Sequence, residues 1–150
     1  MGPQGTLVLV LLCAYGAVSL IAPCGLCGEE IDITIIAQNF LKPPLFNYTV
    51  NVHGEPQSEL IYFLQRAADI DKHLRFTITY FGPVLGYFVN SINNLEGDYA
   101  ENTSWRVTDV DFNSHKLGVS HHIPNHQDTI IFSFTNETYT SEEANISDKA

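Results

Sequence analysis

The stretch Gly82-Pro83-Val84-Leu85-Gly86-Tyr87-Phe88-Val89-Asn90-Ser91-Ile92-Asn93-Asn94 opens the part of the chain that decides the fold. The pattern continues through Trp105, the only tryptophan, and ends in the apolar run Thr129-Ile130-Ile131-Phe132-Ser133-Phe134. Apolar and aromatic residues alternate with polar ones in short runs, and Gly, Pro, Asn and Asp stand between the runs. This pattern is typical of strands joined by hairpins, and not of helices.

Three further segments upstream also alternate, and they predict strands at 31–37, 46–53 and 73–80. The second is followed by Gly54, and its apolar face consists of Phe46, Tyr48, Val50 and Val52. In the third, the residues expected to share one side are Leu74, Phe76, Ile78 and Tyr80.

The segment 58–68 has a helical period instead. Its apolar positions recur at i, i+3, i+4 and i+7, namely Leu60, Phe63, Leu64 and Ala67. The helix cap is expected at Gln57 or Ser58, just after Pro56. Two strands, one helix and several more strands predict an α+β domain, a small, mostly antiparallel twisted sheet with one packed helix.

Length and charge limit the class of protein and its partners. A chain of 150 residues is enough for one domain. It carries 17 acidic and 7 basic residues, for a formal net charge of −10. Phosphate backbones require clustered Lys and Arg, whereas the basic residues here are scattered singly. Nucleic acid and anionic lipid surfaces are therefore poor partners.

Residues 1–27 are predicted to be a secretory signal peptide. An apolar run without charge covers 7–22, and small residues at Ala22 and Gly25 suit cleavage between 24 and 28. An uncleaved membrane anchor is the alternative, because a spanning helix needs about 20 apolar residues.

The three cysteines, Cys13, Cys24 and Cys27, all lie in or beside this leader. The pair Cys24 and Cys27 has the spacing of redox and zinc motifs, but it lacks a βαβ context and a second pair, so an incidental spacing is favoured. The folded part then has no disulfide and depends on its apolar core. After cleavage behind Cys24, Cys27 would remain as an unpaired thiol able to link two chains.

Four glycosylation tripeptides support export. They begin at Asn47, Asn102, Asn136 and Asn145. Together with the leader they predict a secreted, extracellular glycoprotein. The segment 135–150 is rich in Ser, Thr, Asn and Glu, and it is predicted to be a disordered, polar tail that carries two of these sites.

The sequence contains no recognisable catalytic constellation. It has no Gly-x-Ser-x-Gly elbow, no phosphate-binding glycine loop and no His-Glu-x-x-His. The stretch Gly118-Val119-Ser120-His121 comes nearest to an elbow but lacks the second glycine. Asp109 and Asp111 form an i, i+2 pair in a polar loop, where carboxylates are usually only solvated. We therefore expect a protein that is not an enzyme.

Histidines cluster near the C-terminal end of the domain. Four fall within twelve residues and three aspartates stand nearby: His115, His121, His122 and His126 with Asp109, Asp111 and Asp128. Imidazoles and carboxylates can hold zinc or copper. However, adjacent residues of a strand point to opposite faces. A polar rim around hairpin turns is the favoured interpretation, and no metal site is predicted.

Trp105 has two interpretations. It either anchors the core of the sheet, the usual position of a lone tryptophan, or forms an aromatic wall for a large flat ligand. The second interpretation gains from Gly86, which would let the backbone of this run approach a ligand closely.

Several motifs together resemble a known family. The run from Gly86 to Leu95 reads Gly-Tyr-Phe-Val-Asn-Ser-Ile-Asn-Asn-Leu, and Trp105, Leu-Gly-Val-Ser at 117–120 and Ile-Pro-Asn-His-Gln-Asp at 123–128 follow it. With the final apolar strand, these motifs resemble the C-terminal β domain of the cobalamin carriers, the family of intrinsic factor, haptocorrin and transcobalamin. The resemblance covers 31–134 and implies a β-grasp-like domain at 28–134. It further implies that cobalamin, a corrinoid, is carried rather than used in catalysis.

The resemblance also implies which residues would meet the ligand. In the carriers, cobalamin lies between an α-helical domain and the β domain, and two β-domain segments contact it. Their counterparts here are Leu85, Gly86, Tyr87 and Phe88, and a second segment that begins at Trp105, Arg106 and Val107 and runs to Leu117. Apolar side chains would cover the corrin face, and free backbone groups would meet its amide edges.

Two departures from the family shape the functional expectation. The α-helical domain is absent from this sequence, and Arg106 stands where the carriers have Gln. We expect a stand-alone secreted domain that binds cobalamin or another corrinoid weakly, or with a partner that covers the other ligand face. The alternative is an extracellular protein-interaction module that keeps the fold but has lost the ligand.

Overall fold

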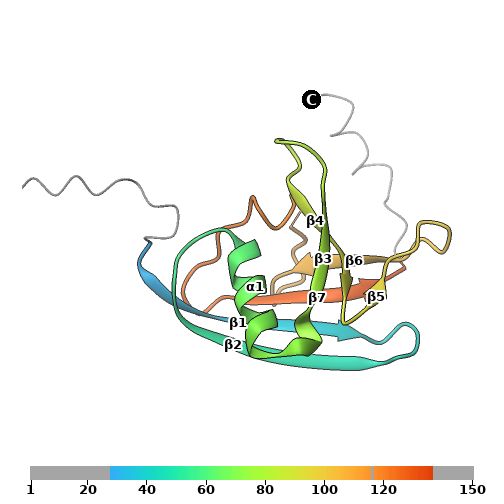
Figure 1. Cartoon of the computed structure of the whole chain (residues 1–150), viewed down its shortest axis with the longest axis horizontal. Helices are drawn as coiled ribbons and strands as arrows, with labels where there is room; N and C mark the ends of the chain where they lie inside the picture. Colours follow the sequence, from blue (N-terminus) through green and yellow to red (C-terminus); the bar gives the residue numbers. More distant parts are fainter. Residues whose placement is uncertain (1–27, 116, 137–150) are drawn as a thin grey trace, which may run out of the picture.

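The computed structural model describes residues 28–115 and 117–136 (Figure 1). In chain order its elements are β1 (Glu30–Asn39), β2 (Phe46–Pro56), α1 (Leu60–Ile70), the 3-10 helix η1 (Lys72–Leu74), β3 (Phe76–Tyr80), β4 (Tyr87–Ile92), β5 (Leu95–Glu96), β6 (Ser104–Thr108) and β7 (Thr129–Thr135). The predicted signal peptide at 1–27, the tail from 137 onward and the Asn145 site lie outside the described residues. No helix in the described part is long and apolar enough to cross a membrane.

The strands form two sheets instead of the single sheet expected. The larger has the order β2-β1-β7-β6, and the smaller has the order β3-β4-β5. All pairings are antiparallel except that of β1 with β7, which is parallel. The predicted class is confirmed: the fold is α+β, with mostly antiparallel strands and one α-helix.

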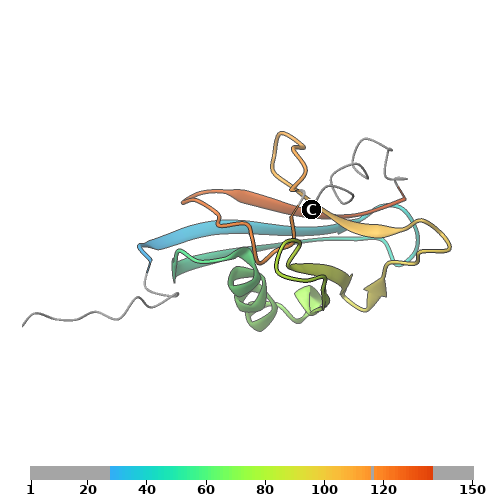
Figure 2. The ribbon, with the colours of Figure 1, turned by 90° about the horizontal axis from the view of Figure 1, so that it is seen from above.

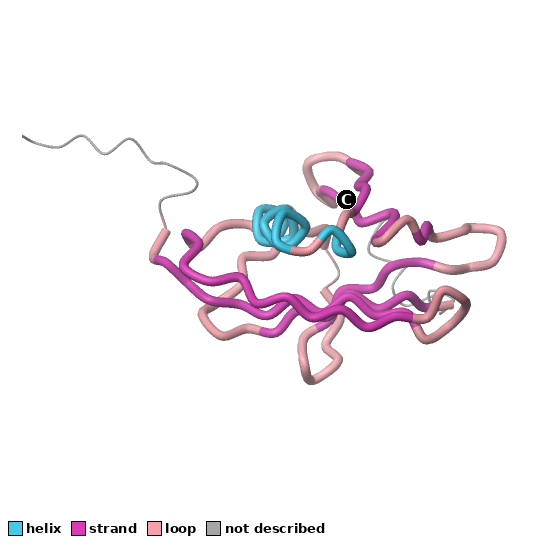
Figure 3. Tube along the Cα trace, turned by 60° about the horizontal axis from the view of Figure 1, so that its bottom comes forward, coloured by secondary structure: helices cyan, strands magenta, loops and turns pink. Residues whose placement is uncertain are grey.

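The arrangement has two layers. The helix α1 and the strands β3, β4 and β5 all cover the same side of the four-stranded sheet (Figure 2). The loop that follows β6 projects from the opposite side (Figure 3). In the described part of the chain, the helix and the small sheet therefore pack on one face of the large sheet, in agreement with strands that alternate apolar and polar residues.

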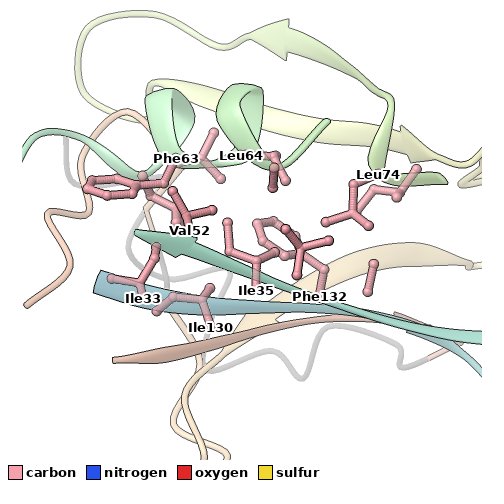
Figure 4. Packing of buried hydrophobic residues seen from close by; sticks show 14 of the residues in the cluster. Ile33, Ile35, Val52, Phe63, Leu64, Leu74, Ile130 and Phe132 are labelled. Carbon is pink, nitrogen blue, oxygen red and sulfur yellow. The ribbon is translucent and has the colours of Figure 1, made fainter. Parts of the chain in front are cut away.

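The apolar core lies between the helix and the large sheet. From β1 it receives Ile31, Ile33, Ile35 and Ala37, all buried, while the residues between them face the open side. The same core receives side chains from β2, β7 and α1. Figure 4 shows Val52, Leu64 and Phe132 around Ile35, and Phe63 farther along the layer, toward Ile33. All four residues of the predicted helical stripe are buried, as expected.

The strand β2 is longer than predicted, because the chain continues past Gly54. Its register with β1 shifts between Ile31 and Ile33, and Gly54 adopts a positive φ of 65° at this irregularity. The Gly54 N–H donates to Asp32 Oδ1 at 2.9 Å, and this hydrogen bond lowers the pKa of the Asp32 carboxyl. Glycine therefore allows the bulge and does not end the strand.

The cap of α1 is not where the sequence placed it. The N-cap residue is Glu59, and its side chain makes no capping hydrogen bond. Two N–H groups of the first turn, which have no partner within the helix, instead donate to carbonyls of a segment distant in the sequence. The Leu60 N–H donates to His122 O at 2.7 Å, and the Ile61 N–H donates to Val119 O at 3.1 Å.

The predicted strand at 73–80 begins later than expected. Asp71 accepts a hydrogen bond from the His73 N–H, and residues 72–74 form η1. From β3 onward the prediction holds. The face that starts at Phe76 is half-buried and ends at Tyr80, which is exposed because the β3–β4 hairpin projects beyond the core.

Candidate functional site

The first predicted ligand segment and the end of the second lie side by side. The Gly118 N–H donates to Leu85 O at 2.9 Å, and the Val119 N–H donates to Tyr87 O at 2.8 Å. The Tyr87 N–H in turn donates to Ser120 Oγ at 3.0 Å. These bonds place Leu117 next to Leu85, although the two residues are far apart in the sequence.

Exposed apolar side chains gather where these segments meet. We call the group the hairpin-tip surface; it consists of Tyr80, Val84, Leu85, Tyr87 and Leu117. The rings of Tyr80 and Tyr87, which are paired across β3 and β4, lie 4.9 Å apart. Phe88 is half-buried and meets Phe81 edge to face at 5.5 Å on the other side of the hairpin. Several large apolar side chains exposed on one hairpin make this region a candidate binding surface.

Gly86 serves the assembly of this surface and not the approach of a ligand. It has a φ of 76°, and a Cβ there would collide with Ser120 Oγ and His121 Nδ1. A Cβ at Gly118 would collide with Tyr87 O. Both glycines therefore allow the two segments to pack closely. Ser120 and His121 fill the space beside Gly86, where the sequence predicts the approach of a ligand.

Trp105 is a core residue. Only 8% of it is exposed, its Nε1–H donates to Leu95 O at 2.9 Å, and its ring contacts the rings of Phe46 and Phe134. The expectation of an exposed aromatic wall is therefore wrong for this residue, and the core-anchor interpretation is correct.

The neighbours of Trp105 on β6 do not join the hairpin-tip surface as a group. Val107 points inward, half-buried against the core. Arg106 points to the opposite face, where its Nε–H donates to Ser114 Oγ at 3.3 Å. Among the described residues of the second predicted segment, the structure thus brings only Leu117 to the exposed residues of the first.

The histidine cluster separates into a pair and two single residues. The rings of His115 and His122 lie 3.9 Å apart. His121 Nε2 contacts Pro83 O at 3.0 Å, and His126 Nδ1 accepts the Asp32 N–H at 3.0 Å. Within 28–115 and 117–136, no three His, Cys, Asp or Glu side chains are placed to hold a metal ion. The sequence did not reveal the pairing, because it depends on how two loops pack.

The carboxylate pair at Asp109 and Asp111 organises a turn. Asp109 Oδ1 accepts the N–H groups of Asp111 and Asn113, each at 2.9 Å, and Oδ2 accepts the Asn113 amide at 2.8 Å. These hydrogen bonds, led by that of the Asn113 side chain, lower the pKa of Asp109. The carboxylate is thus used within its own loop.

Two surface hollows lie beside α1. One, of about 470 Å³, is lined largely by polar residues that include Asp69, Asp71 and Lys72. The other, of about 300 Å³, lies beside Tyr62 and Phe63. None of the residues predicted to meet a ligand lines either of them.

Comparison with known proteins gives structural neighbours. No family model and no curated protein matches the sequence. Haptocorrin in complex with Cbi is similar at a TM-score of 0.58 and 13% identity, over 71% of this chain and 26% of haptocorrin. A "putative metal binding protein" from Ruminococcus gnavus is similar at 0.55 and 9% identity, over 73% of this chain and all of that one.

These likenesses concern the fold. At such identities they do not carry a ligand or a site from one protein to another. The chain spans about a quarter of the length of haptocorrin. The described domain therefore has a fold similar to that of part of haptocorrin and to that of the Ruminococcus gnavus protein.

Proposed function

We propose that this protein binds a corrinoid, cobalamin or a close analogue, on the hairpin-tip surface, and that it acts as a binder and not as an enzyme. The observation that carries the proposal is the meeting of two segments distant in sequence. Their backbones pair, and they leave Leu85, Tyr87 and Leu117 exposed together.

The chemistry of this surface suits a corrinoid. The ring offers a broad apolar face, which exposed leucine and tyrosine side chains can cover. Amide groups at its edge need hydrogen-bond partners, which the hydroxyl groups of the exposed Tyr80 and Tyr87 can offer. The likeness to haptocorrin in complex with Cbi agrees with this choice of ligand.

Such a surface covers one face of the ligand. Each square ångström of apolar contact contributes about 25 cal/mol, so a corrinoid left half in water loses much of the available affinity. The chain matches only 26% of haptocorrin, and a second protein supplying the other face completes the proposed site. Binding by this protein alone is then weak.

Titration tests the proposal. Cyanocobalamin and cobinamide are added to the purified protein, and heat or the visible corrinoid spectrum is followed. Leu117→Asp should abolish the response, because a carboxylate opposes an apolar face. Leu45→Asp is the matched control, since Leu45 is an equally large exposed leucine outside this surface. A wild-type protein without response, or equal loss in both variants, would overturn the proposal.

The second candidate is a protein-interaction module. A separate exposed apolar group, Phe40, Leu41 and Leu45, lies in the connection between β1 and β2. This group is not part of the segments that the carrier resemblance assigns to cobalamin. If wild-type protein ignores corrinoids, an extracellular protein partner covering these side chains becomes the better explanation.

A further inference from the structure

The imidazoles of His115 and His122 are in contact, and the proposed ligand surface does not account for this pair. Their ring centroids lie 3.9 Å apart with a tilt of 42°. The Nε2 atom of each ring is buried and has no hydrogen-bond partner among the described residues. A buried nitrogen without an acceptor suits a neutral ring, because an imidazolium there would be desolvated and unpaired.

The backbone next to this pair connects the start of α1 to the hairpin-tip surface. We call residues 118–122 the bridging segment. Its carbonyls at Val119 and His122 cap the first turn of α1, with distances of 3.1 and 2.7 Å. Its N–H groups at Gly118 and Val119 hold the hairpin-tip surface through Leu85 and Tyr87. Displacement of His122 would thus affect both the helix and that surface.

We propose that the His115–His122 contact makes the bridging segment a pH-sensitive connection. The buried His122 ring keeps it closed at neutral pH, and protonation of this ring in mildly acidic solution opens it and loosens the hairpin-tip surface from α1. Two imidazolium charges at this separation repel each other. The inference does not depend on which ligand the surface binds.

Some charged groups around the pair favour a proton on His122, and others oppose it. Asp128 attracts a proton to His122, and Asp109 interacts with His115. On the side of β6, Arg106 bonds to Ser114 beside His115 and adds positive charge. The start of α1, which receives the His122 carbonyl, is the positive end of the helix dipole.

The balance of these effects favours the neutral ring. Burial is the largest cause that lowers the pKa of His122 below its usual 6.5; the charge of His115 adds to the effect, and Asp128 opposes it. The opened or unfolded chain therefore takes up a proton first as the pH falls. Stabilisation by the neutral His122 ring is complete above pH 6.5, and it is lost as the pH falls through the lowered pKa of the folded state.

Three aspartates affect stability in a more acidic pH range than His122. The pKa values of Asp32, Asp71 and Asp109 are lowered from 3.8, so their contributions to stability are lost only in stronger acid. Between neutral pH and about pH 5, the open-to-closed ratio should rise by at most about tenfold per pH unit for each proton taken up.

Hydrogen exchange on the full chain tests the proposal. The readout is the protection of the amides of Leu60, Ile61, Gly118 and Val119, corrected for the intrinsic effect of pH. Protection should fall by about tenfold between about pH 7.5 and about pH 5.5. In His122→Phe, whose ring cannot be protonated, the fall should be absent. His53→Phe, which replaces an exposed imidazole beside Asp32, should keep it.

Two results would overturn the proposal: equal protection of the wild-type amides at both pH values, or the same fall in His122→Phe as in the wild type. Should His122→Phe fail to fold, His115→Phe takes its place. Proton NMR titration of the wild-type imidazoles gives an independent answer. A His122 ring that titrates at or above pH 6.5 contradicts the account.

Discussion

Trp105 and Tyr87 are aromatic residues in similar sequence contexts, but Trp105 is buried and Tyr87 is exposed. Both stand in alternating runs within segments that the family resemblance assigned to the ligand. Trp105 is 8% exposed and bonded to Leu95 O, whereas Tyr87 is 36% exposed. Alternation tells which residues share a face, but not what covers that face. Here β5 covers one of the two aromatic residues, and the other projects beyond the core.

The first prediction follows from this difference. Trp105→Ala should lower the free energy of unfolding by about 3–5 kcal/mol, because it leaves a cavity among Phe46 and Phe134. Tyr87→Ala should cost less than about 1 kcal/mol, since that ring is partly in solvent. Denaturant unfolding of both variants measures the two effects. Equal stability of Trp105→Ala and the wild type would show that the ring is not a core anchor.

That residues of the first segment meet a ligand stays a prediction. In the structure the run around Leu85 and Tyr87 belongs to the β3–β4 hairpin, where Leu117 joins it. The role of Gly86 was misjudged, because its neighbour, the segment with Ser120 and His121, comes from elsewhere in the chain. The contact of His115 with His122 could not be predicted for the same reason.

Among the elements, α1 was the best predicted and its cap the worst. The i, i+3, i+4 stripe determines which side of a helix is apolar, and all its members are buried. The cap comes from backbone carbonyls of Val119 and His122, which are distant from the helix in the sequence. A carbonyl can cap a helix from any residue type, so the sequence carries no signal for it.

The second prediction concerns the buried side of α1. Leu64→Asp should unfold the domain or destabilise it by more than about 3 kcal/mol, because Leu64 is fully buried against the sheet and a carboxylate there has no partner. Tyr62→Asp, on the exposed side of the same turn, should change the free energy of unfolding by less than about 1 kcal/mol. Thermal melting followed by circular dichroism compares them. An unchanged Leu64→Asp transition would contradict the packing of this helix.

At the scale of the whole molecule, the strands could be predicted but not their partners. The first strand of the chain pairs with the last, in parallel, and this contact joins the N-terminal and C-terminal halves in one sheet. The short β3–β4–β5 sheet then lies over the core and extends past its end. Because pairing depends on contacts distant in the sequence, alternation alone led to a single sheet.

The third prediction concerns secretion and glycosylation of the protein. Of the glycosylation sites, Asn47, Asn102 and Asn136 are exposed in the described part. We expect the protein in the medium of expressing mammalian cells, with a new N-terminus between 25 and 28 and a smaller mass after glycosidase treatment. Asn47→Gln and Asn102→Gln should each remove one step of that mass change. Retention in the membrane fraction with Met1 intact would contradict secretion.

The central claim, that the hairpin-tip surface binds a corrinoid, is tested most directly by mapping cobinamide onto the isotope-labelled protein by amide NMR. The account predicts that the changes in amide chemical shift are concentrated at residues 80–88 and 117–121. The amide signals of the 40–45 connection should not change. Shifts confined to that connection or to the hollows beside α1, or no shift even at millimolar cobinamide, would contradict it.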